Sequence, residues 1–303
     1  KLQEGWRADI VGLSTDTTRA APMYEVLSHL VFSARGEDVE FTMVDGEVLM
    51  AGGEVTVADA DAIRAEAQEV AESLDLEEAR KIVSAAESSS GKCMVGQCIR
   101  FWPEYQKIKE IIDSGEYGSV LAADFSRISP LPDWAWESWL LDAEKSGGAA
   151  IDLHIHDTDF INTLFGVPDA VFAAGVEGPT GGIDYISTHY EYEGGPSAVT
   201  ARGGWSFPST FPFEMASTIL LEEGAIEFST LADPTLKLHP HEGETIVPEV
   251  EEGDGWLREL EYFVDCVEND REPELARPVE ATKSLEIVLK EISSTKDSEL
   301  VEL

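Results

Sequence analysis

Cysteine and basic residues are both scarce in this chain of 303 residues. Its three cysteines, Cys93, Cys98 and Cys266, form neither a disulfide framework nor a CxxC pair, so a reducing cytoplasm fits the sequence. The 21 Lys+Arg stand against 60 Asp+Glu, which gives a net charge of -39. So few cations exclude a general binder of nucleic-acid backbones and argue against docking on anionic membranes. No apolar run approaches the ~20 residues that a membrane-spanning helix needs.

The first residues also lack a signal-peptide core and an initiator methionine, which is consistent with an internal fragment. The excess of acids has two interpretations. Intrinsic disorder is one, but seven Trp, twelve Phe and seven Tyr oppose it. The other is a folded surface adapted to molar salt, where screening removes the self-repulsion of the charges. We favour the second interpretation.

Several catalytic and nucleotide-binding motifs are absent. The chain has no P-loop, no HExxH, no G-x-S-x-G nucleophile elbow and no complete G-x-G-x-x-G fingerprint. Gly253-Asp254-Gly255 matches only the start of that fingerprint, because Arg258 occupies the third glycine position and the flanks are acidic. Acidic flanks would repel a phosphate, so we interpret this stretch as a loop and a helix start.

Hydrophobic periodicity predicts a β-rich head and then helices. Over residues 1–57 we expect short strands, including Ala8–Leu13 and a hairpin at Asp45-Gly46, the strongest kind of short hairpin signal. From Ala58 the period becomes helical, and a second helix is expected to begin near Asp75, where Asp75 and Glu78 form a capping box.

The remainder alternates between helices and strands. We expect a buried strand at Cys93–Ile99, a strand at Ser119–Ile128 and mostly strands over residues 170–248. The expected helices are Glu104–Asp113, Ala149–Phe165, Trp256–Glu268 and Glu280–Glu291. This order predicts an α+β fold: a partial Rossmann-like α/β piece, then an open, mostly antiparallel sheet with flanking helices, all preceded by the small β-rich head.

The stretch Ser146-Gly147-Gly148 through Asp159 is the strongest candidate for chemistry. On a helix Asp152 and His156 are four residues apart and share one face, with Asp159 a turn further along. A carboxylate beside an imidazole holds its tautomer and tunes its pKa, as a general acid/base requires. The spacing is explained equally well by an acidic helix face in contact with solvent, with a histidine whose hydrogen bonds are made within the fold.

The sequence contains two closely spaced histidine pairs that could be mistaken for metal sites. His154 and His156 would point about 200° apart on a helix and could not share one metal, so we predict no metal site. His239-Pro240-His241 is expected in a surface turn that faces solvent.

Two aromatic clusters have both a binding and a packing interpretation. Arg100-Phe101-Trp102-Pro103 follows the expected strand, and open α/β sheets bind ligands at the carboxyl ends of strands, although core packing is as good an explanation. Trp134, Trp136 and Trp139 lie in an acidic, proline-containing loop where they could bind a carbohydrate.

Residues from about 75 to 303 resemble the Gfo/Idh/MocA family, which includes glucose–fructose oxidoreductase and inositol 2-dehydrogenase. Four stretches carry the resemblance in order: Leu76–Ala79, Met94–Tyr105, Ile112–Gly118 and Ser146–Asp159. The resemblance implies nicotinamide-dependent oxidation or reduction of a sugar, inositol or similar polyol, with NAD or NADP as cofactor. It also implies a homo-oligomer formed through the C-terminal sheet.

The same resemblance assigns roles to individual residues. Asp152 and His156 match the family's substrate-binding and proton-transfer pair, and Arg100 and Pro103 match its loop near the nicotinamide. The family's glycine fingerprint is absent, however. Its Glu-Lys-Pro motif with the catalytic lysine falls on Glu69-Val70-Ala71, so the lysine position holds Val70. The resemblance therefore predicts a truncated or chimeric oxidoreductase with impaired cofactor binding.

The segment over about 4–73 resembles the C-terminal tail of chlorohydrolase/deaminase-type amidohydrolases. The stretches that carry it are Gly5–Val11, Pro22–Tyr24, Leu27–Val31 and Val44–Leu49. In that family the tail completes a β-sandwich beside a metal-bearing barrel, whose ligands are missing here, and His29 matches no ligand position. A natural fusion, a gene-model or assembly artefact and a deliberate chimera all fit this pairing.

These resemblances predict three segments: the amidohydrolase-tail-like head with a helix over 1–74, a remnant of a dinucleotide-binding domain over 75–128, and a substrate and oligomerisation domain over 129–303. An oxidoreductase of the sugar-dehydrogenase type is the first functional hypothesis. The alternatives are a non-catalytic module that dimerises or binds carbohydrate, and an amidohydrolase-related hydrolase, which we rank lowest because such chemistry needs a metal-bound water.

Overall fold

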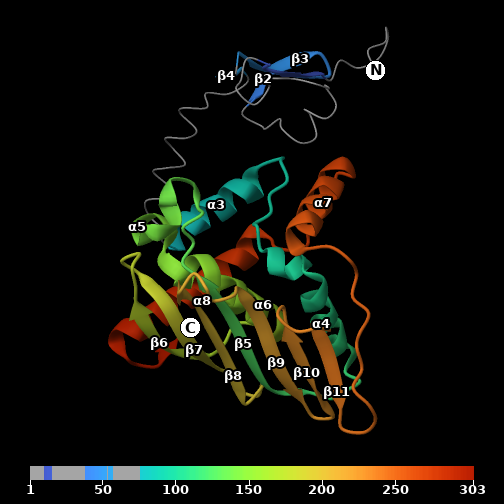
Figure 1. Cartoon of the computed structure of the whole chain (residues 1–303), viewed down its shortest axis with the longest axis vertical. Helices are drawn as coiled ribbons and strands as arrows, with labels where there is room; N and C mark the ends of the chain where they lie inside the picture. The colour runs from blue at the N-terminus through green and yellow to red at the C-terminus, as the bar shows by residue number, and fades with distance from the viewer. Residues whose placement is uncertain (1–9, 16–37, 53, 57–75) are drawn as a thin grey trace. The chain divides into compact units, whose positions relative to one another are not determined.

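The computed structural model describes residues 10–15, 38–52, 54–56 and 76–303 (Figure 1). The chain divides into two compact units, Lys1–Ala71 and Glu72–Leu303. The beginning of the first expected strand, the helix expected from Ala58 and the capping residue Asp75 lie outside the described residues.

The first unit contains a four-stranded antiparallel sheet in sequential order, formed by β1 (Ile10–Leu13), β2 (Val39–Val44), β3 (Glu47–Ala51) and β4 (Glu54–Val55). The predicted hairpin is confirmed: Asp45 and Gly46 connect β2 to β3 with φ values of 50° and 85°. Two consecutive positive φ values are what the tightest hairpin turns require. Among this unit's described residues only Asp38 is buried, so the described strands contribute no buried apolar core.

The second unit is built on an eight-stranded mixed sheet in the order β11-β10-β9-β5-β8-β7-β6-β12. Its central strand β5 runs parallel to β8 and antiparallel to β9. The strands are β5 (Val120–Pro130), β6 (Ala170–Glu177), β7 (Ile183–Glu191), β8 (Ala198–Phe207), β9 (Glu214–Leu221), β10 (Gly224–Ser229), β11 (Leu236–Pro240) and β12 (Val301–Glu302). This confirms the expected open sheet with flanking helices.

Helices cover one face of the sheet and leave the other open (Figure 1). From the helices, Tyr105 meets Phe228 of β10 and Phe160 meets Phe125 of β5 in edge-to-face contacts, with ring centroids 5.1 and 6.0 Å apart. The Tyr105 and Phe160 rings also meet edge to face, at 4.8 Å. Such geometry is favourable beyond the area that it buries. The helices of this unit are α3 (Leu76–Ser88), α4 (Pro103–Ser114), α5 (Ala143–Ser146), α6 (Ile155–Phe165), α7 (Gly255–Glu268) and α8 (Pro278–Asp297).

Local signals explain where several helices begin and end. Pro103 occupies the first turn of α4, where its missing N–H costs nothing, and α4 ends at Gly115 with a φ of 64°. The Asp254 carboxylate accepts a hydrogen bond from the Leu257 N–H at 2.8 Å, so Gly253-Asp254-Gly255 is the predicted loop and helix start. None of the described helices is long and apolar enough to span a bilayer.

Two expectations about secondary structure were wrong. Cys93–Ile99 is not a strand: the segment runs without regular structure into a 3-10 turn, η2 (Cys98–Phe101). Ile99 and Phe101 are buried by packing, and an apolar run cannot by itself distinguish a strand from a packed turn. His239 lies in strand β11, paired with Ala225, and not in a turn. Its imidazole contacts Glu227 and Thr245 and is 39% exposed, so it does face solvent as expected.

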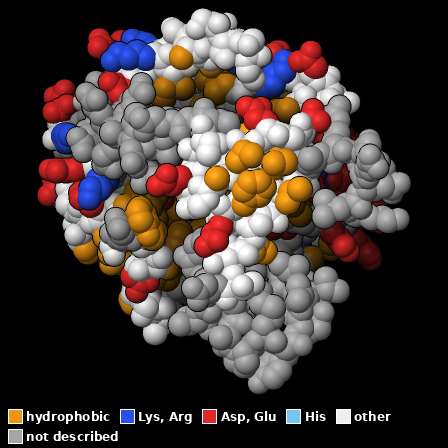
Figure 2. Space-filling view, turned by 90° about the horizontal axis from the view of Figure 1, so that it is seen from above, with side chains coloured by type: hydrophobic (Ala, Val, Ile, Leu, Met, Phe, Trp, Pro, Cys, Tyr) orange, Lys and Arg blue, Asp and Glu red, His pale blue; other side chains and the backbone are white. Residues whose placement is uncertain are grey.

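On the face that Figure 2 shows, acidic side chains are scattered among the described residues and outnumber the basic ones. If this charge reflects adaptation to salt, the folded state needs about molar KCl, where the Debye length falls to about 3 Å from about 10 Å at 0.1 M. We therefore expect the midpoint of thermal unfolding, followed by circular dichroism, to rise between 0.1 M and 2 M KCl. An equal or higher midpoint at low salt would contradict the halophilic interpretation.

Candidate functional site

The candidate site is built on the turn that leads from α5 into α6. Gly147 and Gly148 both have positive φ values, 75° and 70°, and a side chain at Gly148 would lie 3.3 Å from the Ile183 carbonyl oxygen. Glycine is therefore needed for this close approach of two backbones. The next five residues, Ala150–His154, form a π-helical segment, η4, before α6 begins at Ile155. The predicted continuous helix over Ala149–Phe165 is thus interrupted, and π segments often occur at functional sites.

A cavity of about 300 Å³ opens beside this segment. Asp152 and His156 both line it, so the two residues singled out in the sequence lie at one cavity. Much of the remaining lining is aromatic or aliphatic: Ile99, Trp102, Pro132, Trp134, Leu140, Leu153, Trp205, Phe213, Met215 and Trp256. A few polar groups set in an apolar wall are typical of small-molecule sites.

Burial shifts the pKa values of both residues. Loss of solvation raises the pKa of Asp152 to about 6. Loss of solvation, together with the charge of Arg127, lowers the pKa of His156 to about 3. His156 is therefore neutral at physiological pH, and its Nδ1 lies 3.3 Å from the Gln97 Oε1. If Nδ1 donates to this oxygen, Nε2 carries the free lone pair and can accept a hydrogen bond.

Arg127 is a cavity residue that the sequence did not reveal. Its side chain is only 3% exposed, and its Nε and Nη2 donate to the two Asp157 carboxylate oxygens at 3.1 and 2.9 Å. Nη2 also donates to the Tyr105 hydroxyl at 3.2 Å. In the sequence, the strand that contains Arg127 shows only an alternation of apolar and polar residues. Nothing in this local pattern distinguishes Arg127 from a cation on the surface.

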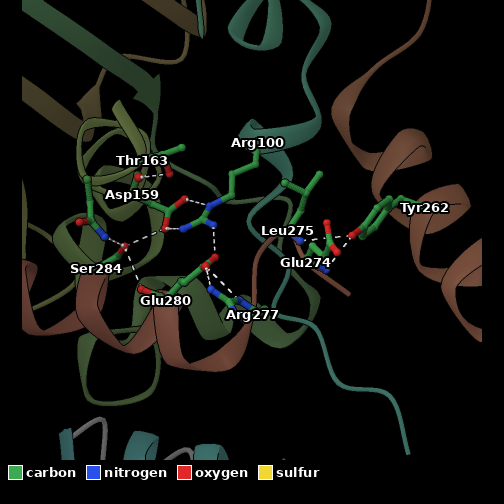
Figure 3. Close-up of polar contacts among 10 residues, drawn as sticks. Arg100, Asp159, Thr163, Tyr262, Glu274, Leu275, Arg277, Glu280 and Ser284 are labelled. Atoms are coloured by element: carbon green, nitrogen blue, oxygen red, sulfur yellow. Dashed lines mark hydrogen bonds and ion pairs between the residues drawn. The ribbon is translucent and has the colours of Figure 1, made fainter. Parts of the chain in front are cut away.

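Asp159 and Arg100 lie away from the cavity and pair with each other (Figure 3). Arg100 donates to both Asp159 oxygens at 2.7 and 2.8 Å and to Glu280 at 2.6 Å, and Ser284 donates to Asp159 at 2.7 Å. The helical spacing had predicted that Asp159 extends the face formed by Asp152 and His156. This prediction is wrong, because Asp159 points to Arg100 instead. The interruption by η4 and the buried partner on η2 turn it toward Arg100.

The predicted cofactor residues have structural partners here. The side chain of Arg100 is 8% exposed and joins η2 to α6 and α8 through its two carboxylate partners. Pro103 is buried in the first turn of α4. Whether either residue lies near a nicotinamide stays a prediction of the family resemblance.

His154 faces a different environment from His156. Its Nε2 lies 2.7 Å from Glu291, which also accepts hydrogen bonds from Thr158 at 3.1 Å and Thr188 at 3.0 Å. His154 and Glu291 are both fully buried. Across the described ranges no group of three or more His, Cys, Asp or Glu is arranged to hold a metal ion.

The raised pKa of Asp152 predicts a cost in stability. The unfolded carboxyl ionises near pH 4 and the folded one near pH 6, so the native state loses stability as the pH rises through this window. Asp152→Asn should therefore be more stable than the parent above pH 6, by on the order of 2–3 kcal/mol, with the gap closing toward pH 4. Urea unfolding at pH 4, 5, 6 and 7 measures it.

The surface variant Asp113→Asn is the control, because Asp113 pairs with Lys109 on the outside of α4. A gap for Asp152→Asn that is the same at pH 4 and pH 7 would show that burial does not raise the pKa of this carboxyl.

Comparisons with known proteins agree with this fold. Residues 105–227 match the model of the GFO/IDH/MocA C-terminal domain. Scyllo-inositol 2-dehydrogenase (NAD(+)) of Bacillus subtilis is 26% identical over 245 residues, which cover 76% of this chain and 68% of that protein. The structure of levoglucosan dehydrogenase in complex with NADH and levoglucosan has a TM-score of 0.65 at 16% identity, covering 76% of this chain and 71% of that one.

Deaminases give only short matches. A 5-methylthioadenosine/S-adenosylhomocysteine deaminase of Haloarcula marismortui is 38% identical over 74 residues, which cover 24% of this chain and 17% of the deaminase. The chain thus spans less than a fifth of this relative's length, whereas the dehydrogenase match covers most of both proteins. With the family's C-terminal domain model matched within it and the eight-stranded sheet shared with oxidoreductases, the second unit of this chain belongs to the Gfo/Idh/MocA family.

Proposed function

We propose that the second unit binds a neutral sugar, inositol or similar polyol in the Asp152–His156 cavity, as the substrate part of a nicotinamide-dependent oxidoreductase. The observation that carries this proposal is the convergence of Asp152, His156 and Arg127 on one aromatic-walled cavity. Vicinal hydroxyl groups both donate and accept hydrogen bonds, and the wall packs against the apolar ring faces.

The cavity residues have distinct roles in this proposal. Above pH 6 the Asp152 carboxylate accepts a hydrogen bond from one hydroxyl group. The Asp152 carboxylate, whose raised pKa makes it the stronger base of the two, takes the proton of the hydroxyl that is to be oxidised. Neutral His156 accepts a hydrogen bond from the substrate at Nε2, while Gln97 holds Nδ1. The nearby charge of Arg127 favours the alkoxide that this proton transfer creates.

The described residues do not fit a dinucleotide. The family implies NAD or NADP, but no turn in the described part of the chain carries a complete G-x-G-x-x-G before a helix, and the first turn of α3 carries Glu77 and Glu78. Carboxylates at a helix N-terminus oppose a pyrophosphate there. Arg100 is already held by Asp159 and Glu280. We therefore propose a truncated or chimeric form of the oxidoreductase, whose cofactor binding is impaired.

We also propose that the uncovered face of the sheet forms a homo-oligomer. Leu121 and Leu220 are 41% and 44% exposed on the adjacent strands β5 and β9.

The three proposed segments keep the boundary near residue 74 between the β-rich head and the rest of the chain. Because β5 is hydrogen-bonded to β8 and β9 along its length, we place the boundary between the second and third segments ahead of Val120 rather than at residue 128.

Three free cysteines support the prediction of a cytoplasmic location.

The test is binding of polyols to the whole chain. Scyllo-inositol and levoglucosan, titrated calorimetrically at pH 7.5 in 2 M KCl, are the probes. We expect at least one to bind, with a loss of about tenfold in Asp152→Asn and in His156→Phe. Asp113→Asn should bind like the parent. Binding that is unaffected by both cavity variants would place the ligand elsewhere and refute the proposal.

A further inference from the structure

Three tryptophans on one short segment are exposed to solvent beside the cavity. The side chains of Trp134, Trp136 and Trp139 are 80%, 78% and 41% exposed. Tryptophan is highly buried on average in folded proteins, because its ring removes a large apolar area from water. Three exposed indoles within six residues therefore indicate a binding surface, which we call the tryptophan platform.

The backbone of the platform is anchored. Ala135 and Leu140 point inward and are buried with Trp205 of β8. The 3-10 turn η3 (Trp136–Leu141) is followed directly by α5, and the Ser146 hydroxyl donates to the Leu140 carbonyl at 3.2 Å. The buried side chains of Ala135 and Leu140 hold this segment in place, so the three indoles project from a turn whose backbone is fixed.

The platform is continuous with the cavity. Trp134 lines the cavity with Asp152 and His156, while most of its side chain remains in contact with solvent. A molecule seated in the cavity and extending past Trp134 would therefore meet the rest of the platform.

The chemistry around the platform favours a neutral saccharide. Asp133 and Asp142 flank the indoles, and the chain's charge of -39 opposes anionic ligands. Carboxylates accept hydrogen bonds from sugar hydroxyls, and the C–H faces of sugar rings pack against the negative faces of indoles. Among the described residues the three indoles make no ring contact with one another. They therefore do not form the closed aromatic cage that binds a quaternary ammonium ion.

We propose that the substrate is a glycoside or oligosaccharide, whose reacting ring enters the cavity while its further sugar units lie on the tryptophan platform. This inference rests on the proposed function, because it takes the Asp152–His156 cavity as the site of the reacting ring. It adds that the ligand is larger than one ring.

The test compares saccharides of increasing length. Glucose, xylose, mannose and N-acetylglucosamine, and the matching cello-, xylo-, manno- and chito-tetraoses, are titrated calorimetrically into the whole chain in 2 M KCl. We expect at least one tetrasaccharide to bind about tenfold more tightly than its monosaccharide, which corresponds to about 1.4 kcal/mol. In Trp136→Ala this ratio should fall to about one. Phe172→Ala removes an aromatic ring that is 44% exposed on β6, outside the cavity lining, and is the matched control.

The outcomes separate the two proposals. Asp152-dependent binding with no gain from chain length would overturn the platform and leave the proposed function standing. If no saccharide binds, and neither scyllo-inositol nor levoglucosan binds, both proposals are overturned. A Trp136→Ala variant that loses the gain but also changes in mass by light scattering would show that the indoles form a subunit contact, which also overturns the platform as a saccharide site.

Discussion

Arg127→Met should remove much of the stability of the second unit, by about 3–5 kcal/mol, because it leaves Asp157 as an unpaired charge in the core. The Asp157 side chain is fully buried and meets Arg127 through two hydrogen bonds at 2.9 and 3.1 Å. The Tyr105 hydroxyl loses its donor at the same time. Since a domain of this kind is stable by only about 5–15 kcal/mol, the loss is a large fraction of the total. Urea unfolding in 2 M KCl at pH 7.5 measures it.

The double variant Arg127→Met/Asp157→Leu tests the cause of that loss. Replacing a buried ion pair by apolar side chains is often close to neutral, so the double variant should recover most of the stability. Asp157→Leu alone should be destabilising, since it leaves the guanidinium unpaired. If the double variant is as unstable as the sum of the two single variants, then packing rather than the unpaired charge explains the loss.

Titration with NAD or NADP should show no saturable binding at concentrations below about 1 mM, and no hydride transfer from any inositol or sugar. The pyrophosphate requires a G-x-G-x-x-G turn that leads into a helix N-terminus, and no described turn carries this complete fingerprint. Val70 also stands where the family resemblance expects the catalytic lysine. Loss of a positioned acid/base group removes about 10²–10⁴ in rate, and loss of the cofactor removes the reaction.

Isothermal titration in 2 M KCl is the measurement, and levoglucosan dehydrogenase, whose structure contains NADH, is the parallel positive control. A micromolar dissociation constant for this chain would contradict the proposed impairment. It would mean that the chain builds a cofactor site without the usual fingerprint. Polyol binding through Asp152 would be unaffected by either result, so this experiment tests the cofactor side of the proposal separately.

Local patterns along the chain determine much of the architecture by themselves. The Asp45-Gly46 dipeptide predicts its hairpin, because few residues tolerate two consecutive positive φ values. Pro103 and Gly115 mark the ends of α4, and Asp254 marks the start of α7, since these residues satisfy or omit the terminal hydrogen bonds. The spacing of Asp152 and His156 singles out two residues that both line the candidate cavity, although a solvated helix face explained that spacing equally well.

Only the tertiary structure decided which partners the buried charges take. In the sequence, Arg127 is only one cation in an expected strand. Its position in the core depends on its ion pair with Asp157, which lies 30 residues away. Asp159 follows Asp152 by helical spacing, yet it binds Arg100, which lies 59 residues away in the sequence. Burial of Ile99 likewise comes from packing around a 3-10 turn and not from a sheet. Periodicity reports which residues avoid water, whereas the pairing of buried charges depends on segments that meet only in the folded chain.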